Sequence, residues 1–236
     1  MRDSATVPMS SAHDATPTGM RYARRSAALR TEHLPFRVRL AQSPADLARA
    51  IGVRHAAYAR HLPPALCEAM RQPEPLDLEG RSLILLAESR ADGSALGTLR
   101  IQMNTRQPLL LESAVALPDW MQGRRLAEAT RLAVTASVTG QLVKTTLVKA
   151  AYELCLARGV DFMVIAARSP ADRLYERLLF RDVFPDGRRV PLEYAFQLPH
   201  RVLFSDIQMA KNQWEAAQHP LLEFMAYTRH PDICLH

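Results

Sequence analysis

The sequence predicts an α/β fold in which helices cover the faces of a mixed sheet. An antiparallel hairpin is indicated by two strand-like segments, residues 82–88 and 95–103, that flank a turn at residues 91–94. A strand–helix–strand unit follows, because residues 126–135 and the apolar run 162–167 lie on either side of an amphipathic helix pattern. A hairpin followed by such a unit excludes a helical bundle and a β-sandwich.

A tail and a short strand precede the hairpin. Residues 1–34 are rich in Ser, Thr, Ala, Pro and Arg without apolar periodicity, so we expect a disordered N-terminal tail. Residues 36–40 alternate between apolar and basic side chains, which predicts a short strand. We therefore expect a single domain over residues 35–236, with a helical extension at its C-terminal end.

The first helix is marked by its N-terminal cap. Ser43 precedes Pro44 and Asp46, a combination that is typical of a helix start. One stripe of this helix consists of four side chains at helical spacing: Leu47, Ile51, Arg54 and Tyr58. Arg54 occupies an apolar position in this stripe, and a buried guanidinium group costs free energy unless it is paired or functional.

The later elements follow from similar signals. The amphipathic helix at residues 143–154 ends before Gly159, which suits the left-handed position after a helix. Residues 169–172 repeat the Ser-Pro-x-Asp helix start of the first helix. A closing strand is expected at residues 190–198, and a further helix near residues 206–217.

Composition and charge narrow the functional classes. Hydrophobic residues make up 48% and charged residues 23% of the 236 residues, so the chain can bury a core without disulfides or metals. The formal net charge is +6, but Arg and Lys are spread along the whole chain without a zinc finger, an RNP signature or a basic zipper. These features argue against nucleic-acid binding and favour a basic surface, which suits an acidic protein partner or an anionic membrane surface.

The cysteines and the apolar segments indicate where in the cell the protein resides. Cys67, Cys155 and Cys234 form no C-x-x-C pair and no metal-ligand spacing with histidine, which favours reduced thiols. No apolar run approaches the roughly 18 residues of a membrane span, and the N-terminus has no apolar signal region. We expect a cytoplasmic protein without a transmembrane segment, a metal or a cofactor of its own.

Several motifs resemble those of the GNAT superfamily from about residue 36 onward. Residues 172–180 are similar to its late helix, x-x-L-Y-x-x-x-G-F. The string E-A-T-R-L-A-V at residues 128–134 resembles the E-x-x-R-[LF]-x-V string of one branch, which contains acyl-homoserine-lactone synthases and N-acyl amino acid synthases of the FeeM type. Other residues that carry the resemblance are Arg54 with Tyr58, Asp77, Gly97-Thr98-Leu99-Arg100 and His230-Pro231-Asp232-Ile233.

The resemblance implies a GNAT-like mixed, mostly antiparallel twisted sheet flanked by helices, and an N-acyltransferase. The pyrophosphate loop of coenzyme-A-dependent members, [RQ]-x-x-G-x-[GA], is missing, since residues 138–141 read only V-T-G-Q. Without a glycine-rich cradle at a helix N-terminus, a diphosphate has little to hold it. We therefore expect a long-chain acyl group carried by acyl carrier protein, an acidic partner that a basic surface would attract.

Uneven preservation of the branch motifs favours an amino acid as acceptor. The homoserine-lactone branch carries a tryptophan soon after its first helix, whereas here tryptophan occurs only at Trp120 and Trp214. Its E-x-D-x-x-D loop is reduced to Glu74, Asp77 and Glu79. A cationic sulfonium acceptor needs acids or aromatic faces, whereas a carboxylate needs a cation. We expect an amino acid or a similar small amine, and not S-adenosylmethionine.

Two residues of the 128–134 string are the main catalytic candidates. Glu128, within an apolar segment, is the candidate general base acting through a water, since burial would raise its pKa toward the useful range. The alternative is a strand-edge glutamate paired with an arginine. Arg131 shares a face with Glu128 only if a bulge intervenes, which the resemblance implies. Arg131 would then orient Glu128 or bind a substrate carboxylate.

The candidate substrate-binding residues each have a structural alternative. Arg54 either crosses the core to meet Asp77 or Glu128, or binds an anionic acceptor. Tyr58 is either a core aromatic or part of a pocket lining, and Arg100 is either solvated or in contact with a ligand. Asp77 belongs to the loop that follows the first helix.

Tyr175 matches the position where GNAT acetyltransferases place a tyrosine that protonates the leaving thiolate, although its helix also needs an inward aromatic side chain. Three other functions stay open: an acyl-homoserine-lactone synthase, an acyl-coenzyme-A-dependent acetyltransferase, and a GNAT-like module that binds without catalysis. Apolar residues in place of Glu128 or Arg131 would have indicated the last, and neither is replaced.

Overall fold

The computed structural model describes residues 29–235. Its strands are β1 (Arg30–Thr31), β2 (Phe36–Leu40), β3 (Leu83–Ser89), β4 (Ala95–Met103), β5 (Leu126–Val134), β6 (Phe162–Ala167), β7 (Arg181–Asp182), β8 (Arg189–Leu192), β9 (Leu198–Asp206), β10 (Thr228–Arg229) and β11 (Ile233–Cys234). Its α-helices are α1 (Pro44–Tyr58), α2 (Pro64–Ala69), α3 (Pro75–Leu78), α4 (Leu110–Ala114), α5 (Gly140–Ala157), α6 (Asp172–Arg177) and α7 (Ala210–Ala216). Two short 3₁₀ helices and one π-helical turn complete them: η1 (Asp119–Met121), η2 (Glu193–Ala195) and η3 (Glu223–Tyr227).

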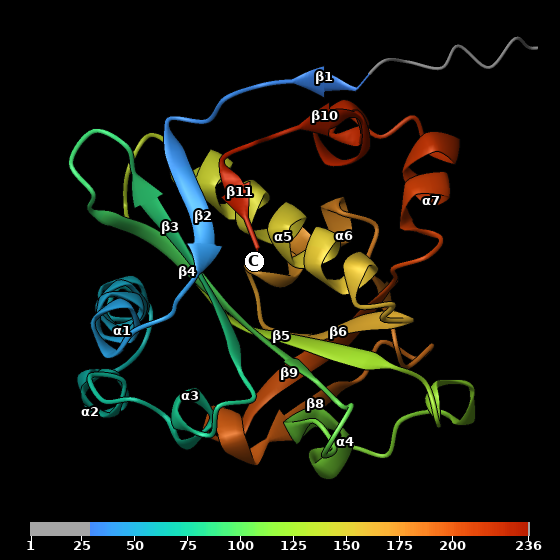
Figure 1. Ribbon diagram of the computed structural model, residues 1–236. Coiled ribbons are helices and arrows are strands. Elements are labelled where there is room, and N and C mark those ends of the chain that lie inside the picture. The colour runs from blue at the N-terminus through green and yellow to red at the C-terminus, as the bar shows by residue number, and fades with distance from the viewer. Residues whose placement is uncertain (1–28, 236) are drawn as a thin grey trace, which may run out of the picture.

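The main sheet has the strand order β11-β2-β3-β4-β5-β6-β9-β7, with β8 beside β9 (Figure 1). Its neighbouring strands are antiparallel except for two parallel pairs, β11 with β2 and β5 with β6. Helices lie on both sides of this mixed, mostly antiparallel sheet, so the predicted fold class is confirmed.

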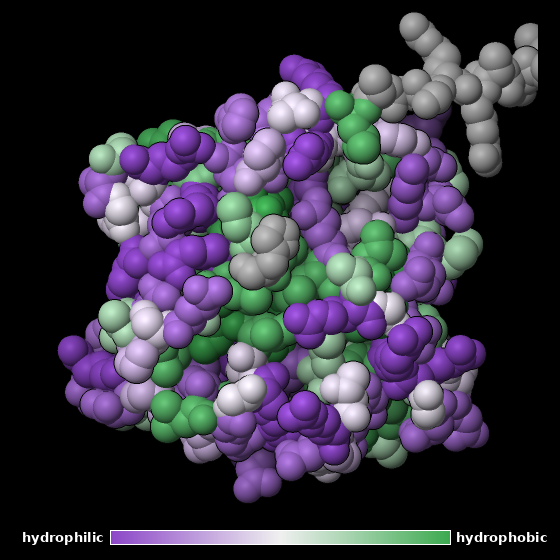
Figure 2. All heavy atoms as spheres, viewed as in Figure 1, coloured by the Kyte–Doolittle hydropathy of each residue, from purple (hydrophilic) through white to green (hydrophobic). Residues whose placement is uncertain are grey.

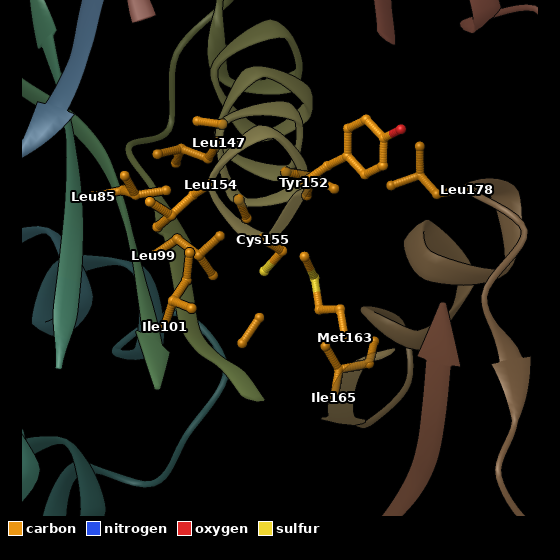
Figure 3. Packing of buried hydrophobic residues seen from close by; sticks show 14 of the residues in the cluster. Leu85, Leu99, Ile101, Leu147, Tyr152, Leu154, Cys155, Met163, Ile165 and Leu178 are labelled. Atoms are coloured by element: carbon orange, nitrogen blue, oxygen red, sulfur yellow. The ribbon is translucent and has the colours of Figure 1, made fainter. Parts of the chain in front are cut away.

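Helix α5 covers one face of the sheet and forms the larger hydrophobic core with it. Leu147 and Leu154 of this helix point toward Leu99 of β4 (Figure 3). The helix lies close to the strand at Gly97, where an added Cβ would come within 2.7 Å of Val143 Cγ1. A residue without a side chain is therefore required at this contact.

Helix α1 covers the opposite face, and its start is the one that the sequence predicts. Ser43 Oγ accepts a hydrogen bond of 3.1 Å from the backbone N–H of Asp46. Val53 and Ala57 of this helix pack against Ala133 of β5. The position of Arg54 between these apolar neighbours places its guanidinium group inside the molecule.

Strands β5 and β6 pair over three positions only, which end at Glu128 and Val164. Beyond these residues β5 continues beside β4, and β6 continues beside β9. Glu128 therefore lies at the point where the two parallel strands part. The side chain of Glu128 is nevertheless covered at this point, because Leu111 of α4 and Tyr194 of η2 both bond to it.

The closing strand lies further along the chain than the sequence predicts. The closing strand, expected at residues 190–198, is β9 at Leu198–Asp206, where it pairs with the whole of β6. The expected range contains the end of β8, η2 and two left-handed residues, Phe196 and Gln197, which cannot continue a strand. The helix expected near residues 206–217 is present as α7.

The predicted Ser-Pro start at residues 169–172 does not cap a helix. Helix α6 begins only at Asp172, and the residue before it, Ala171, has no side-chain cap. Most of the expected tail, residues 1–28, lies outside the described residues. Its last part is ordered, since β1 pairs with β10 and Leu34 is buried, so an ordered segment begins earlier than residue 35.

Hydrophobic side chains gather near the centre of the face seen in Figure 2, around the end of α5 and the adjoining strands, and hydrophilic side chains surround them. None of the helices within residues 29–235 combines the length and the apolar character that crossing a bilayer requires.

Candidate active site

A bulge in β5 brings the predicted residues onto one face of the sheet. The backbone of Arg131 is left-handed, with φ of 57°, and the pairing of β4 with β5 shifts between Thr98 and Arg100. Without the bulge, Glu128 and Arg131 would point to opposite faces. With it, both side chains lie on the face that α1 covers, as the sequence analysis required for a shared site.

Five charged side chains on this face form one network, which we call the buried network: Arg54, Glu74, Asp77, Arg100 and Arg131. Arg54 Nη1 donates to both carboxylate oxygens of Asp77, at 3.0 and 2.8 Å. Arg100 Nη1 bridges the two acids, at 2.8 Å from Glu74 and 3.1 Å from Asp77. Arg131 Nε donates to Glu74 at 2.7 Å, and its Nη2 forms a second bond there.

Helix α3 positions the two acids of the network. Glu74 is its N-cap residue, and the carboxylate of Asp77 accepts a bond of 3.1 Å from the Glu74 backbone N–H. Burial by itself would raise the pKa of Glu74, but the bond to Arg131 and the charge of Arg100 outweigh it and hold the pKa at about 2. The acid therefore stays ionised at neutral pH.

The buried network carries an excess of positive charge, because three guanidinium groups face two carboxylates. Arg54 and Arg100 are 3% and 2% exposed, so little of this charge is screened by water. Two nitrogens of Arg54, Nε and Nη2, are buried without an acceptor in the described part of the chain. Such an arrangement attracts an anion and has donors left to bind it.

A narrow pocket of about 10 Å³, room for roughly one water molecule, borders this network. Arg54, Tyr58, Glu74 and Arg131 line it, together with apolar and amide side chains of α1 and the α2–α3 connection. Of the two roles expected for Tyr58, core aromatic or pocket lining, the structure shows the second. Its side chain is only partly buried. The pocket places an aromatic ring and the surplus of positive charge at the same opening.

Glu128 is fully buried next to this network. Its carboxylate accepts bonds from the Leu111 backbone N–H at 3.2 Å and from the Tyr194 hydroxyl at 3.0 Å. Burial raises its pKa, although both bonds and the positive charges of Arg100 and Arg131 oppose the rise. A carboxylate with a raised pKa is suited to accept a proton near neutral pH.

The structure decides between several alternatives of the sequence analysis. Arg54 meets Asp77 and not Glu128. Arg100 is not solvated, because α1 and α3 bury the polar face of β4, and its Nε donates to Thr130 Oγ1 at 3.1 Å. Glu128 is not a strand-edge residue paired with an arginine.

Tyr175 is not a member of the buried network, although Tyr58, which lines the pocket, lies close enough to add to the rise of its pKa. Tyr175 belongs to the hydrophobic core beneath α5, with its ring centroid 5.3 Å from that of Phe180. Burial raises its pKa far above the ordinary value. Tyr175 is therefore the inward aromatic side chain that its helix was expected to need. Its role in protonating the leaving thiolate stays a prediction.

Sequence reasoning missed two partners within the site. Glu74 appeared only as the remnant of an acidic loop, yet it joins Arg100 to Arg131, and the pattern Glu-Pro-x-Asp of a helix start could have indicated it. Tyr194 holds Glu128 from 66 residues away, and no local signal predicts such a contact.

A comparison with known protein families identifies the family of this chain. The model of the family described as "N-acyl amino acid synthase FeeM" matches residues 49–193, which include the buried network and Glu128. The chain belongs to this family. It is an acyltransferase, and the resemblance found in the sequence is confirmed. No curated protein sequence matches the chain significantly.

Solved structures agree with the FeeM-family fold. FeeM, an N-acyl amino acid synthase from uncultured soil microbes, superimposes with a TM-score of 0.59 at 17% identity, over 80% of this chain and 97% of that one. BjaI, a coenzyme-A-dependent acyl-homoserine lactone synthase, gives 0.54 at 16% identity, over 83% and 93%. The PaiA N-acetyltransferase of Thermoplasma acidophilum gives 0.51 at 15% identity, over 73% and 99%. At these identities the structures establish the GNAT fold.

Proposed function

We propose that the protein transfers a fatty acyl group from acyl carrier protein to the amino group of an amino acid, which yields an N-acyl amino acid. The observation that carries this proposal is the pair of spare donors on Arg54, beside a pocket in a network with excess positive charge. The family match supports the same reaction class.

The amino acid carboxylate is the anion that suits the buried network. A planar guanidinium group binds a carboxylate through two parallel N–H···O bonds, and Nε with Nη2 is one of the edges that allows this. Asp77 engages only Nη1 of Arg54, so this edge stays available without breaking the ion pair.

The buried acid supplies the next step of the proposed reaction. Glu128 accepts the proton of the acceptor amine through a water, and the amine nitrogen then attacks the thioester carbonyl carbon. The carbon–sulfur bond breaks as the tetrahedral intermediate collapses. The leaving thiolate takes the proton that Glu128 accepted, so the carrier leaves as a thiol and the Glu128 carboxylate is regenerated. Tyr194 keeps the Glu128 side chain in place during this transfer through its 3.0 Å bond.

The carrier-protein donor rests on two features of the chain. The loop before α5 lacks the glycine-rich sequence that would hold a diphosphate, and Thr139, the residue that precedes the helix, makes no side-chain cap. The net charge of +6 suits an acidic carrier. Coenzyme A is the second candidate donor, because BjaI, a structural neighbour, is described as coenzyme-A-dependent.

We place this reaction in the cytoplasm. Within the described residues Cys67, Cys155 and Cys234 are free thiols, and burial raises the pKa of Cys155 to about 12. Free thiols of this kind suit a reducing compartment.

A competition assay tests the proposal. The purified protein receives the twenty amino acids together with S-adenosylmethionine, and either a long-chain acyl carrier protein or the matching coenzyme A ester. Mass spectrometry should identify N-acyl amino acids as the main product, formed faster from the carrier protein and more slowly as salt screens the encounter. Acyl-homoserine lactone as the main product would exclude the proposed acceptor. Equal turnover with the coenzyme A ester would exclude the proposed donor.

A further inference from the structure

Gln102 of β4 lies directly opposite Glu128 of β5 in the strand pairing. Residues that are paired across antiparallel strands point to the same face with their Cβ atoms about 5 Å apart, so these two side chains are neighbours. Gln102 is 3% exposed, and its Nε2 has no hydrogen-bond acceptor within residues 29–235. A buried amide donor without an acceptor costs free energy. The pairing of β4 with β5 uses backbone groups and does not require an amide side chain at this position.

The carboxylate of Glu128 can accept further hydrogen bonds. It accepts one bond from Leu111 and one from Tyr194, whereas an ionised carboxylate has about four acceptor positions. No direct bond joins Gln102 to Glu128. A donor on one strand and an acceptor on the next that do not bond directly are the partners that a bridging water needs.

We propose that Gln102 is a positioning residue that holds the proton-relay water between the acceptor amine and Glu128. This inference rests on the proposed function, because it assigns the water that the acyl transfer requires. The amide Nε2–H of Gln102 donates to the water oxygen, and one water proton points at the Glu128 carboxylate. During the attack the water gives that proton to Glu128 and takes one from the amine nitrogen, so the water is regenerated.

The same strand offers a matched control. Thr98 lies on the same face of β4, is fully buried, and has a hydroxyl group that also lacks a partner among the described residues. It pairs with Ala133, beyond the bulge and away from Glu128. A change at Thr98 therefore repeats the removal of a buried polar group without touching the proposed water.

The test compares Gln102→Met with Thr98→Val in the acyl transfer assay. Methionine keeps the unbranched length of glutamine and removes the amide donor. We expect the kcat of Gln102→Met to fall about tenfold, the effect of losing one positioning hydrogen bond, while the KM for both substrates stays within twofold. The thermal midpoint should change little, because the hydrogen bond that is lost goes to a water and not to another part of the chain. Thr98→Val should keep its kcat within twofold.

Two results would overturn the inference. The first is a Gln102→Met protein with a wild-type kcat, while the wild type itself makes N-acyl amino acids, which leaves the proposed function intact. The second is an equal loss in Thr98→Val. If Gln102→Met does not fold, Gln102→Asn withdraws the amide by one methylene, and the same criteria on kcat and KM apply. A wild-type protein that forms no N-acyl amino acid would instead refute the proposed function.

Discussion

Two arginine–carboxylate networks in this protein have the same composition but differ in burial and in the number of unused hydrogen-bond donors. The buried network joins three arginines to Glu74 and Asp77 on the face under α1. A second one, which we call the surface network, joins three arginines to Asp46 and Glu88 near β2: Arg37, Arg39 and Arg49.

The surface network leaves no donor of its central residue unused. Arg39 directs Nε, Nη1 and Nη2 to Glu88, Asp46 and the Leu40 carbonyl in five hydrogen bonds. Its other two arginines have side chains that are 55% and 34% exposed, so water screens their excess charge. In the buried network Arg54 uses one nitrogen, and its side chain is 4% exposed. The difference teaches that burial and unused donors, and not the count of charges, distinguish a candidate binding site from a structural ion cluster.

Removal of the buried carboxylate should have the largest effect on the reaction. We expect Glu128→Gln to lower turnover by roughly 10²-fold or more, the usual scale for loss of a general base. Its thermal midpoint should stay the same or rise at neutral pH, because burial penalises the charged acid that glutamine replaces. The measurements are steady-state kinetics and thermal unfolding. A folded variant with a near wild-type rate would remove Glu128 from the mechanism.

Acid should stop turnover before it weakens the surface network. Because burial raises the pKa of Glu128, turnover should fall about tenfold per pH unit from a pH above 4.5, the ordinary value. The pKa of Glu88 is lowered to about 2, since its bonds to Arg39 and Arg49 outweigh the effect of burial. The stability that Glu88 contributes is present above pH 4.5 and is lost only as the pH falls from there through about 2. A pH–rate profile beside acid unfolding checks this order, and simultaneous loss of rate and fold would contradict it.

A conservative change of Arg54, the residue proposed to bind the acceptor carboxylate, should alter the binding of the acceptor alone. We expect Arg54→Lys to raise the KM for the amino acid about tenfold, equal to about 1.4 kcal/mol, because lysine keeps the charge and loses the planar pair of donors. The KM for the acyl donor serves as the internal control and should stay within twofold. An unchanged acceptor KM would mean that Arg54 only pairs with Asp77.

The surface network should affect stability and leave the reaction unchanged. Arg39→Met removes the shared partner of Asp46 and Glu88, so we expect the free energy of unfolding to fall by about 2 kcal/mol, the scale of a lost charged hydrogen bond. Both KM values and kcat should stay within twofold. Urea unfolding and the acyl transfer assay measure the two quantities. A fivefold rise in the acceptor KM would show that the two networks are coupled.

Local signals in the sequence predicted the first helix and most strands. The Ser43 cap, the hairpin around residues 91–94 and the buried strand at 162–167 depend on neighbours within a few residues. The closing strand was wrong by about one strand length, because residues 190–206 carry two apolar segments. Only pairing with β6 decides that the second of them forms the long strand.

The sequence by itself determined which charged residues are candidates for the chemistry, and the tertiary structure decided which neighbours each of them has. Arg54 could be recognised as misplaced on an apolar stripe, since helical spacing depends on the local chain alone. Its partner, its free nitrogens and the excess charge around it come from α3, β4 and β5, which are brought together across up to 57 residues between Glu74 and Arg131. The surface network carries the same residue types, so composition could not separate the two. Desolvation separates them, because it depends on every atom packed around a group and is fixed only when the whole chain has folded.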